Sequence, residues 1–169
     1  LALVDGAAIA AGEGEIALSF ESEGRSPAAA LAAAGGNGRY SLDDFRLEGV
    51  TPAAFTAALA GARDSAGVSS AFSAMRGGQG LDFGSVSGSI ALSGGEMTFS
   101  PVTHADGDAE VTVKTIADLA QGQIDLDVGL ALKARPNLPP MSVAYAGPPA
   151  ALVRSENTSE LATSLGVTI

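Results

Sequence analysis

Apolar and polar residues alternate along most of the second half of the chain. The stretch "GQIDLDVGLAL" (122–132) places Ile124, Leu126, Val128 and Leu130 between polar or small residues. A period of two residues predicts a β-strand with one apolar face and one wet face. Because such stretches recur between short glycine-rich turns, we expect residues 81–153 to form an antiparallel strand meander, in which 122–132 pairs with 109–116 as a hairpin.

The apolar positions of this meander are the candidate site residues. On an antiparallel sheet they would form one continuous stripe, which faces either the protein core or an apolar ligand. A place in the core is the simpler interpretation for any single member. The members are Val86, Ile90, Met97, Phe99, Val111, Val113, Ile124, Leu126, Val128 and Leu130.

The segment 9–76 mixes strand and helix patterns instead. Two segments, 26–35 and 51–61, each begin with the order that starts a helix, a capping residue followed by proline, and each ends in glycine. We expect the first to form a short helix over 27–34. A further helical turn is expected at 68–75. Residues 38–50 alternate but break at two aspartates, which predicts either one strand with a bulge or two strands around a tight turn.

These patterns predict a single domain over residues 1–169, of the mainly β, α+β class. We expect a curved, twisted antiparallel β-meander whose apolar concave face is partly covered by two or three short helices. The helices must bury Phe55, Leu59, Phe72 and Met75, and an uncovered apolar sheet would aggregate. At the C-terminal end, Asn157 and Glu160 form a capping-box pattern that predicts a helix over 157–166.

Composition and charge narrow the possible functions. The net charge of −10 would repel nucleic acids and anionic membrane surfaces, so we expect no nucleic-acid partner. The absence of cysteine excludes disulfides and thiolate chemistry. The sequence begins at Leu1 without a membrane-spanning pattern, and we expect a membrane anchor to lie upstream in a longer parent protein.

Few residues are arranged for catalysis. His104 is the only histidine and stands with Asp106 in "HADGD", whose spacing fits no calcium loop, so we interpret the segment as a solvated turn. "GEGEIA" (12–17) imitates a dinucleotide fingerprint but runs into a strand. Asp125 and Asp127 share a strand face that is most simply wet. Since no nucleophile is paired with a base, we predict a non-enzymatic protein without catalytic residues, a metal or a cofactor.

Two longer segments each contain a recognisable order of turns, strands or helices. They are "SEGRSPAAALAAAGGNGRYSLDDFRLEGVTPAAFTAAL" (22–59) and "AEVTVKTIADLAQGQIDLDVGLAL" (109–132). Together they resemble the C-terminal region of the AsmA family of bacterial envelope proteins. The positions that carry the resemblance are Gly24, Ser26, Pro27, Leu31, Gly36, Gly38, Leu42, Leu47, Gly49, Asp118, Leu119, Gly122, Asp125 and Leu126.

The resemblance implies a periplasmic domain whose parent protein is anchored in the inner membrane. It implies a role in outer-membrane assembly and in phospholipid transport between the two membranes, with acyl chains lying on the apolar side of a curved sheet. The alternative is a structural or interaction domain that caps a longer β-groove or docks on an envelope protein. A sheet filled by its own helices would favour the alternative.

Overall fold

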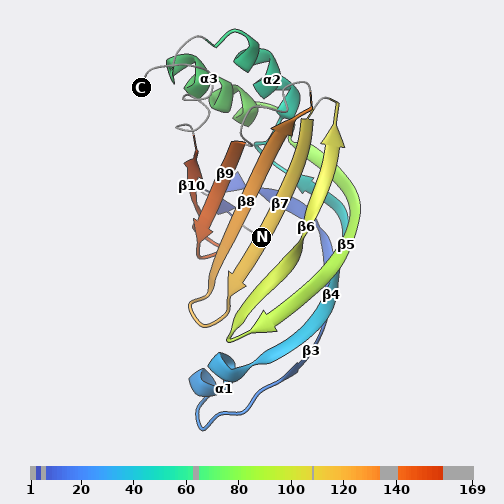
Figure 1. Cartoon of the computed structure of the whole chain (residues 1–169), viewed down its shortest axis with the longest axis vertical. Coiled ribbons are helices and arrows are strands. Elements are labelled where there is room, and N and C mark those ends of the chain that lie inside the picture. The colour runs from blue at the N-terminus through green and yellow to red at the C-terminus, as the bar shows by residue number, and fades with distance from the viewer. Residues whose placement is uncertain (1–2, 5–6, 63–64, 108, 134–140, 158–169) are drawn as a thin grey trace.

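The computed structural model describes residues 3–4, 7–62, 65–107, 109–133 and 141–157, and its main feature is one eight-stranded antiparallel sheet (Figure 1). Each strand pairs with the next one along the chain, as in a meander. A separate hairpin consists of β1 (Leu3–Val4) and β2 (Ala7–Ala8). The strands of the sheet are β3 (Ala10–Glu21), β4 (Gly35–Leu47), β5 (Leu81–Ser93), β6 (Glu96–Asp106), β7 (Ala109–Asp118), β8 (Gln123–Leu132), β9 (Met141–Gly147) and β10 (Val153–Glu156).

Three short helices lie at the two ends of this sheet. Helix α1 (Pro27–Ala33) is at one end, while α2 (Pro52–Ala60) and α3 (Ser65–Arg76) lie together at the other (Figure 1). The Ser26 hydroxyl accepts a hydrogen bond from the amide of Ala29 at 3.2 Å, which confirms the expected cap of α1. Among the described residues, no helix combines the length and apolarity needed to cross a membrane.

The cap expected at Thr51 is not made by its side chain. Thr51 precedes α2, but its hydroxyl makes no capping hydrogen bond. The side chain instead packs against Gly78, where an added Cβ would collide with it, and Thr51 Oγ1 is buried without a partner among the described residues. Packing beside the end of α3 therefore outweighs local capping at this position.

Strand β4 is a single bent strand, which settles the choice left open for residues 38–50. Asp44 has a positive φ of 52°, and the pairing register of β4 with β5 shifts between Leu42 and Phe45. A bulge of this kind increases the local twist and bends the strand. The strand with a bulge is therefore the correct interpretation.

One glycine of β5 permits a close approach between strands. Gly88 is directly paired with Tyr40 of β4, and a Cβ added to the glycine would lie 2.6 Å from the tyrosine ring. The Tyr40 hydroxyl passes over this position and donates a hydrogen bond to the carbonyl oxygen of Ser100 at 2.8 Å. The missing side chain at Gly88 thus lets one tyrosine connect β4 to β6.

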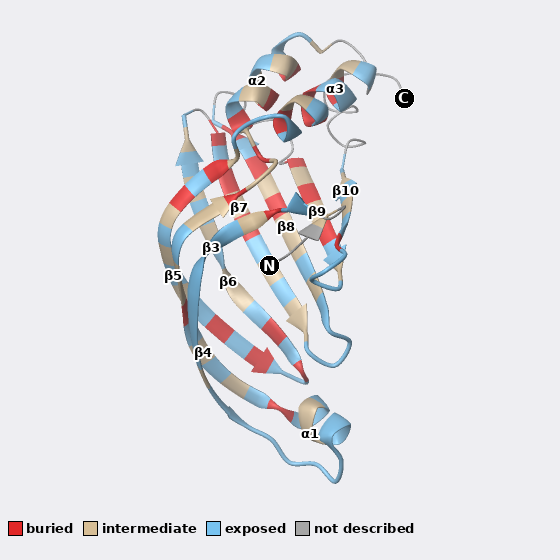
Figure 2. Cartoon of the chain, turned by 180° about the vertical axis from the view of Figure 1, so that it is seen from behind, coloured by how far each residue is buried: buried red, intermediate tan, exposed pale blue. Residues whose placement is uncertain are grey.

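The buried residues, coloured red in Figure 2, belong to two clusters. The larger cluster joins α2 and α3 to the sheet, and in it the Phe55 and Phe72 rings meet edge to face at 5.2 Å. The burial expected for Phe55, Leu59, Phe72 and Met75 is confirmed. The smaller cluster contains Ala34, Tyr40, Ile90, Leu92 and Met97.

Several boundaries differ from the sequence-based expectation. Strand β3 begins at Ala10, so the "GEGEIA" segment lies inside a strand and opens no helix. Strand β6 extends through His104 to Asp106, which places the histidine in a strand rather than a turn. No pattern predicted β1, β2 or β10. The helix expected over 157–166 lies outside the described residues, apart from Asn157.

Candidate apolar binding site

The sheet curls around an apolar cavity of about 220 Å³. Its walls come from β3 and β4 on one side and from β6, β7 and β8 on the other. Strands β4 and β8 are not neighbours in the sheet, so a cavity that both line requires the sheet to curl. Its apolar lining includes Leu42, Phe45, Phe99, Val102, Ile124 and Leu126.

The polar groups of this cavity are few and uncharged. Tyr40, Ser100 and Thr115 contribute the polar side chains of its lining, and the Tyr40 hydroxyl is already bonded to the Ser100 carbonyl. No charged side chain lines the cavity within the described part of the chain. Such a lining can bind hydrocarbon, but it offers little for recognising a polar ligand or for acid–base chemistry.

The ten sequence-predicted residues fall into three environments. Phe99, Val113, Ile124 and Leu126 line the cavity. Three more, Val111, Val128 and Leu130, are buried in the larger cluster, which lies toward α2 and α3. Val86 is half-buried and packs against this cluster. The remaining two, Ile90 and Met97, are buried in the smaller cluster.

Strand pairing places most of these residues on one face of the sheet. Val111 is directly opposite Leu130, and Val113 is directly opposite Val128. The hairpin expected between 109–116 and 122–132 is therefore confirmed. Directly paired residues point to the same face of an antiparallel sheet, so the alternation identified a shared face correctly.

The sequence-based stripe omitted cavity residues from the first half of the chain. Tyr40, Leu42 and Phe45 line the cavity, as do Ile16 of β3 and Leu152 from the segment before β10. The alternation around Tyr40 and Leu42 carried a usable signal, because the same period of two occurs there. Leu152 had no such signal, since it lies outside any alternating stretch.

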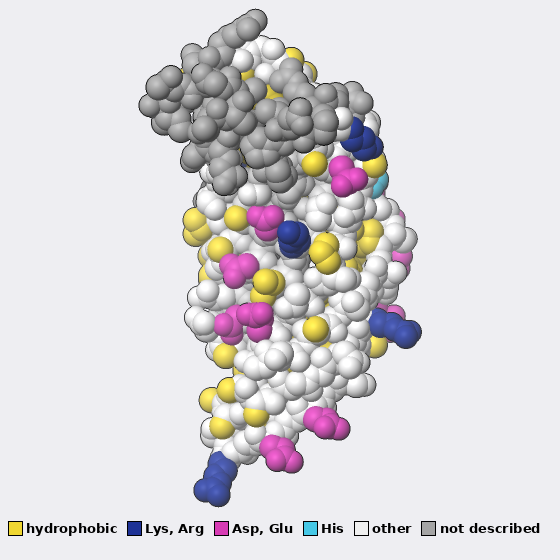
Figure 3. All heavy atoms as spheres, viewed as in Figure 1, with side chains coloured by type: hydrophobic (Ala, Val, Ile, Leu, Met, Phe, Trp, Pro, Cys, Tyr) yellow, Lys and Arg dark blue, Asp and Glu magenta, His cyan; other side chains and the backbone are white. Residues whose placement is uncertain are grey.

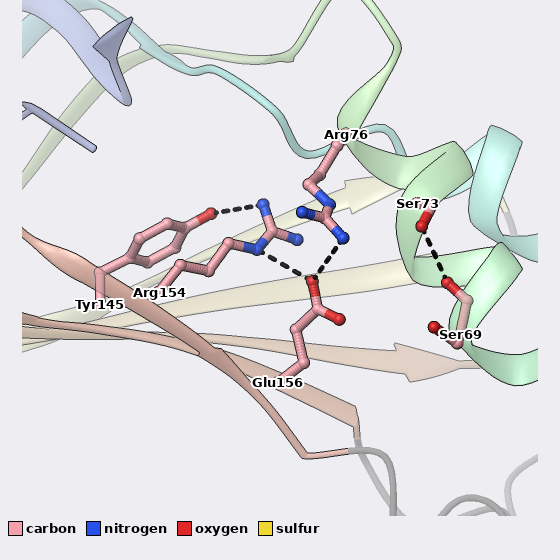
Figure 4. A network of polar contacts seen from close by, with 6 residues as sticks. All are labelled: Ser69, Ser73, Arg76, Tyr145, Arg154 and Glu156. Carbon is pink, nitrogen blue, oxygen red and sulfur yellow. Dashed lines mark hydrogen bonds and ion pairs between the residues drawn. The ribbon is translucent and has the colours of Figure 1, made fainter. Parts of the chain in front are cut away.

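A polar network lies beside the cavity (Figure 4). Glu156 Oε1 is 3.1 Å from Arg154 Nε and 3.5 Å from Arg76 Nη2. Arg154 Nη1 donates to the Tyr145 hydroxyl at 3.2 Å, whereas Arg154 Nη2 is buried without a partner among the described residues. One carboxylate thus bridges two arginines and ties α3 to the edge strand β10.

This network borders a second, more open cavity of about 770 Å³. Arg76, Arg154 and Glu156 line it, and its lining shares Ile9 and Leu152 with the apolar cavity. The network therefore lies on the wall of the second cavity, whose mixed polar and apolar lining meets that of the apolar cavity at Ile9 and Leu152.

Burial raises the pKa of the Tyr145 hydroxyl above its ordinary value, because the phenolate would lose its hydration. The positive charge of Arg154 opposes this effect, and the negative charge of Glu156 adds to it. Tyr145 is consequently a neutral hydrogen-bonding group at neutral pH.

The residues considered for catalysis are not brought together. The His104 ring lies 5.1 Å from that of Phe83 and is half-buried, which corrects the solvated-turn interpretation. Asp125 is exposed on the face opposite Ile124, and Asp127 lies on the same side as Asp125. Acidic and basic side chains are scattered over the surface seen in Figure 3, and no group of metal-ligating residues occurs among those the structure describes.

Comparisons with known proteins add no assignment: no family model, curated protein or solved structure matches the chain.

Proposed function

We propose that this chain is a non-enzymatic periplasmic domain of an AsmA-like envelope protein. In this proposal it supports outer-membrane assembly and phospholipid transport between the membranes, and the parent protein is anchored in the inner membrane. The apolar face of the sheet would be concave, partly covered by α2 and α3, and open elsewhere to acyl chains.

The observation that carries the proposal is the apolar cavity between β3–β4 and β6–β8. Its volume of about 220 Å³ is below the roughly 300–1,000 Å³ of pockets for drug-sized ligands. It could therefore hold part of an acyl chain, with the remainder lying along the open side. The exposed apolar side chains of Ile16 and Phe20 on β3 would extend this path.

A matched pair of substitutions tests the proposal. Ile124 lines the cavity, whereas Ile116 on the neighbouring strand points to the opposite face, directly across from Asp125. Ile124→Asn should reduce the lipid that co-purifies from a bacterial host and the binding of a fluorescent fatty acid. Ile116→Asn makes the same chemical change outside the cavity and should leave both unchanged.

A third variant separates lost binding from lost folding. Ile124→Phe keeps the site apolar but fills part of the cavity, so it should weaken fatty-acid binding while the protein remains folded. Thermal unfolding measured on each variant establishes that it is folded. Equal loss of lipid in Ile124→Asn and Ile116→Asn, or a folded wild-type domain that takes up no lipid, would contradict the proposal.

The second candidate is a structural domain that caps a longer β-groove or docks on an envelope protein. This candidate is favoured by the way α2 and α3 fill one end of the apolar face. Their residues Phe55, Leu59, Phe72 and Met75 are buried against the strands. Under this function, added fatty acid should leave the melting temperature unchanged, both in this domain and in its parent protein.

A further inference from the structure

The edge of β3 is the longest unpaired strand edge in the described sheet. Strand β3 runs from Ala10 to Glu21 and pairs on one side with β4, while its other side has no partner strand among the described residues. The opposite edge, β10, covers only Val153–Glu156. A row of free amides and carbonyls of this length is a template for another strand.

Bulges, proline and lysine, which commonly protect a sheet edge, are missing from most of β3. Its register irregularity lies between Ala11 and Glu13, and the remaining stretch from Gly14 to Glu21 pairs continuously with β4. That stretch contains neither proline nor lysine. Its backbone is therefore regular enough to accept a ladder of hydrogen bonds.

The two faces of this edge have different chemistry. Ile16 and Phe20 are directly paired to Tyr40 and Gly36, and they are 55% and 61% exposed. These exposures are high because no strand of the described part of the chain lies beyond β3 to cover them. A neighbouring strand with apolar residues on the same face would bury both side chains.

The opposite face of β3 is acidic. Glu13, Glu15 and Glu21 alternate with the apolar row and are exposed, and none of them forms an ion pair within the described part of the chain. On the neighbouring strand β4, Asp43 lies directly across from Glu13 and adds a fourth carboxylate, while Arg39, directly across from Ala17, is a basic side chain on this face. A strand that pairs here meets negative charge on this face, so basic side chains would be favoured.

A second copy of the chain fits this edge poorly. The antiparallel register that places Ile16 of one copy opposite Phe20 of the other also places Glu15 opposite Glu21. Directly opposed like charges destabilise a strand pair, and each copy carries a net charge of −10.

We propose that the outer edge of β3 binds an extended segment of a partner protein by strand addition. The segment alternates apolar side chains, which cover Ile16 and Phe20, with basic side chains, which meet Glu13, Glu15 and Glu21. Backbone hydrogen bonds supply affinity, and the alternating side chains supply specificity. The partner segment covers Ile16 and Phe20, and both side chains also lie on the acyl-chain path of the lipid proposal. The two kinds of binding share these side chains and are therefore tested separately.

The test uses two capped peptides, one of alternating valine and lysine and one of alternating valine and glutamate. The wild-type domain should bind the lysine peptide and slow amide hydrogen exchange in Gly14–Glu21. A variant carrying Glu13→Lys, Glu15→Lys and Glu21→Lys should bind the lysine peptide roughly tenfold more weakly or worse. The same variant should gain binding of the glutamate peptide, which an unfolded protein would not do specifically.

Three results would overturn the proposal. The first is equal binding of both peptides by the wild type, and the second is protection that appears at Val153–Glu156 instead of in β3. The third is a dimer of the chain, detected by sedimentation, whose β3 amides are protected without any peptide. Fatty-acid binding is measured separately, so failure here leaves the lipid proposal standing.

Discussion

Replacing Phe55 with alanine should reveal whether α2 and α3 belong to the cooperative core of the sheet. Phe55 is fully buried, its ring meets that of Phe72 at 5.2 Å, and it belongs to the same cluster as Val111 and Leu130 of the strands. Truncating a buried phenylalanine costs about 3–5 kcal/mol, through lost burial and the cavity left behind. Domains of ordinary stability have about 5–15 kcal/mol in total, so this is a large share.

The assay is urea and thermal unfolding followed by circular dichroism. At about 2–4 °C per kcal/mol for a chain of this size, the melting temperature of Phe55→Ala should fall by roughly 6–20 °C. The transition should remain single, because helices and strands share one core.

Phe20→Ala is the matched control, since it makes the same change at a side chain that is 61% exposed. Its effect on the free energy of unfolding should stay within about 0.5 kcal/mol. Equal destabilisation by the two substitutions would refute the reasoning. So would an early transition in Phe55→Ala that removes helix signal alone and leaves the sheet intact, because the helices would then be a separate unit.

Three further predictions concern polar contacts, pH and close packing. Glu156→Gln should cost about 1–3 kcal/mol of stability, because its carboxylate bridges two arginines in a largely buried site. Glu48→Gln, in an exposed ion pair, should cost at most about 1 kcal/mol, and equal losses would contradict this. Burial raises the pKa of the Tyr145 hydroxyl in the folded state. The stability that neutral Tyr145 contributes is therefore fully present below the ordinary tyrosine pKa of about 10, and it is lost as the pH rises from that value through the folded-state pKa. Tyr145→Phe should therefore flatten the loss of stability with rising alkaline pH, and an unchanged pH profile would contradict the assignment. Gly88→Ala should destabilise by about 1–3 kcal/mol, since its Cβ would lie 2.6 Å from an aromatic ring carbon. Gly129→Ala, whose nearest contact would be an ordinary 3.7 Å, is the control and should be close to neutral in thermal unfolding.

The alternation in the sequence determined strands β3 to β9, the consecutive pairing of β5 to β9, and the face that their apolar residues occupy. These features are local: the period of two assigns faces, and short glycine-rich turns favour pairing of consecutive strands. The prediction of 109–116 paired with 122–132 was correct for this reason. The helix starts were also local, although Thr51 shows that packing can override a capping signal.

Tertiary structure alone decided what each apolar residue contacts. Ile16 and Ile124 occupy equivalent positions in alternating stretches, yet Ile16 lies on an open edge while Ile124 is half-buried between two other strands. Curvature depends on pairing across the whole sheet and on bulges such as the one near Asp44, so a sequence window does not contain it. The bridge from Arg76 through Glu156 to Arg154 has the same origin, because Arg76 of α3 is far along the chain from the two β10 residues and meets them only when the last strand docks.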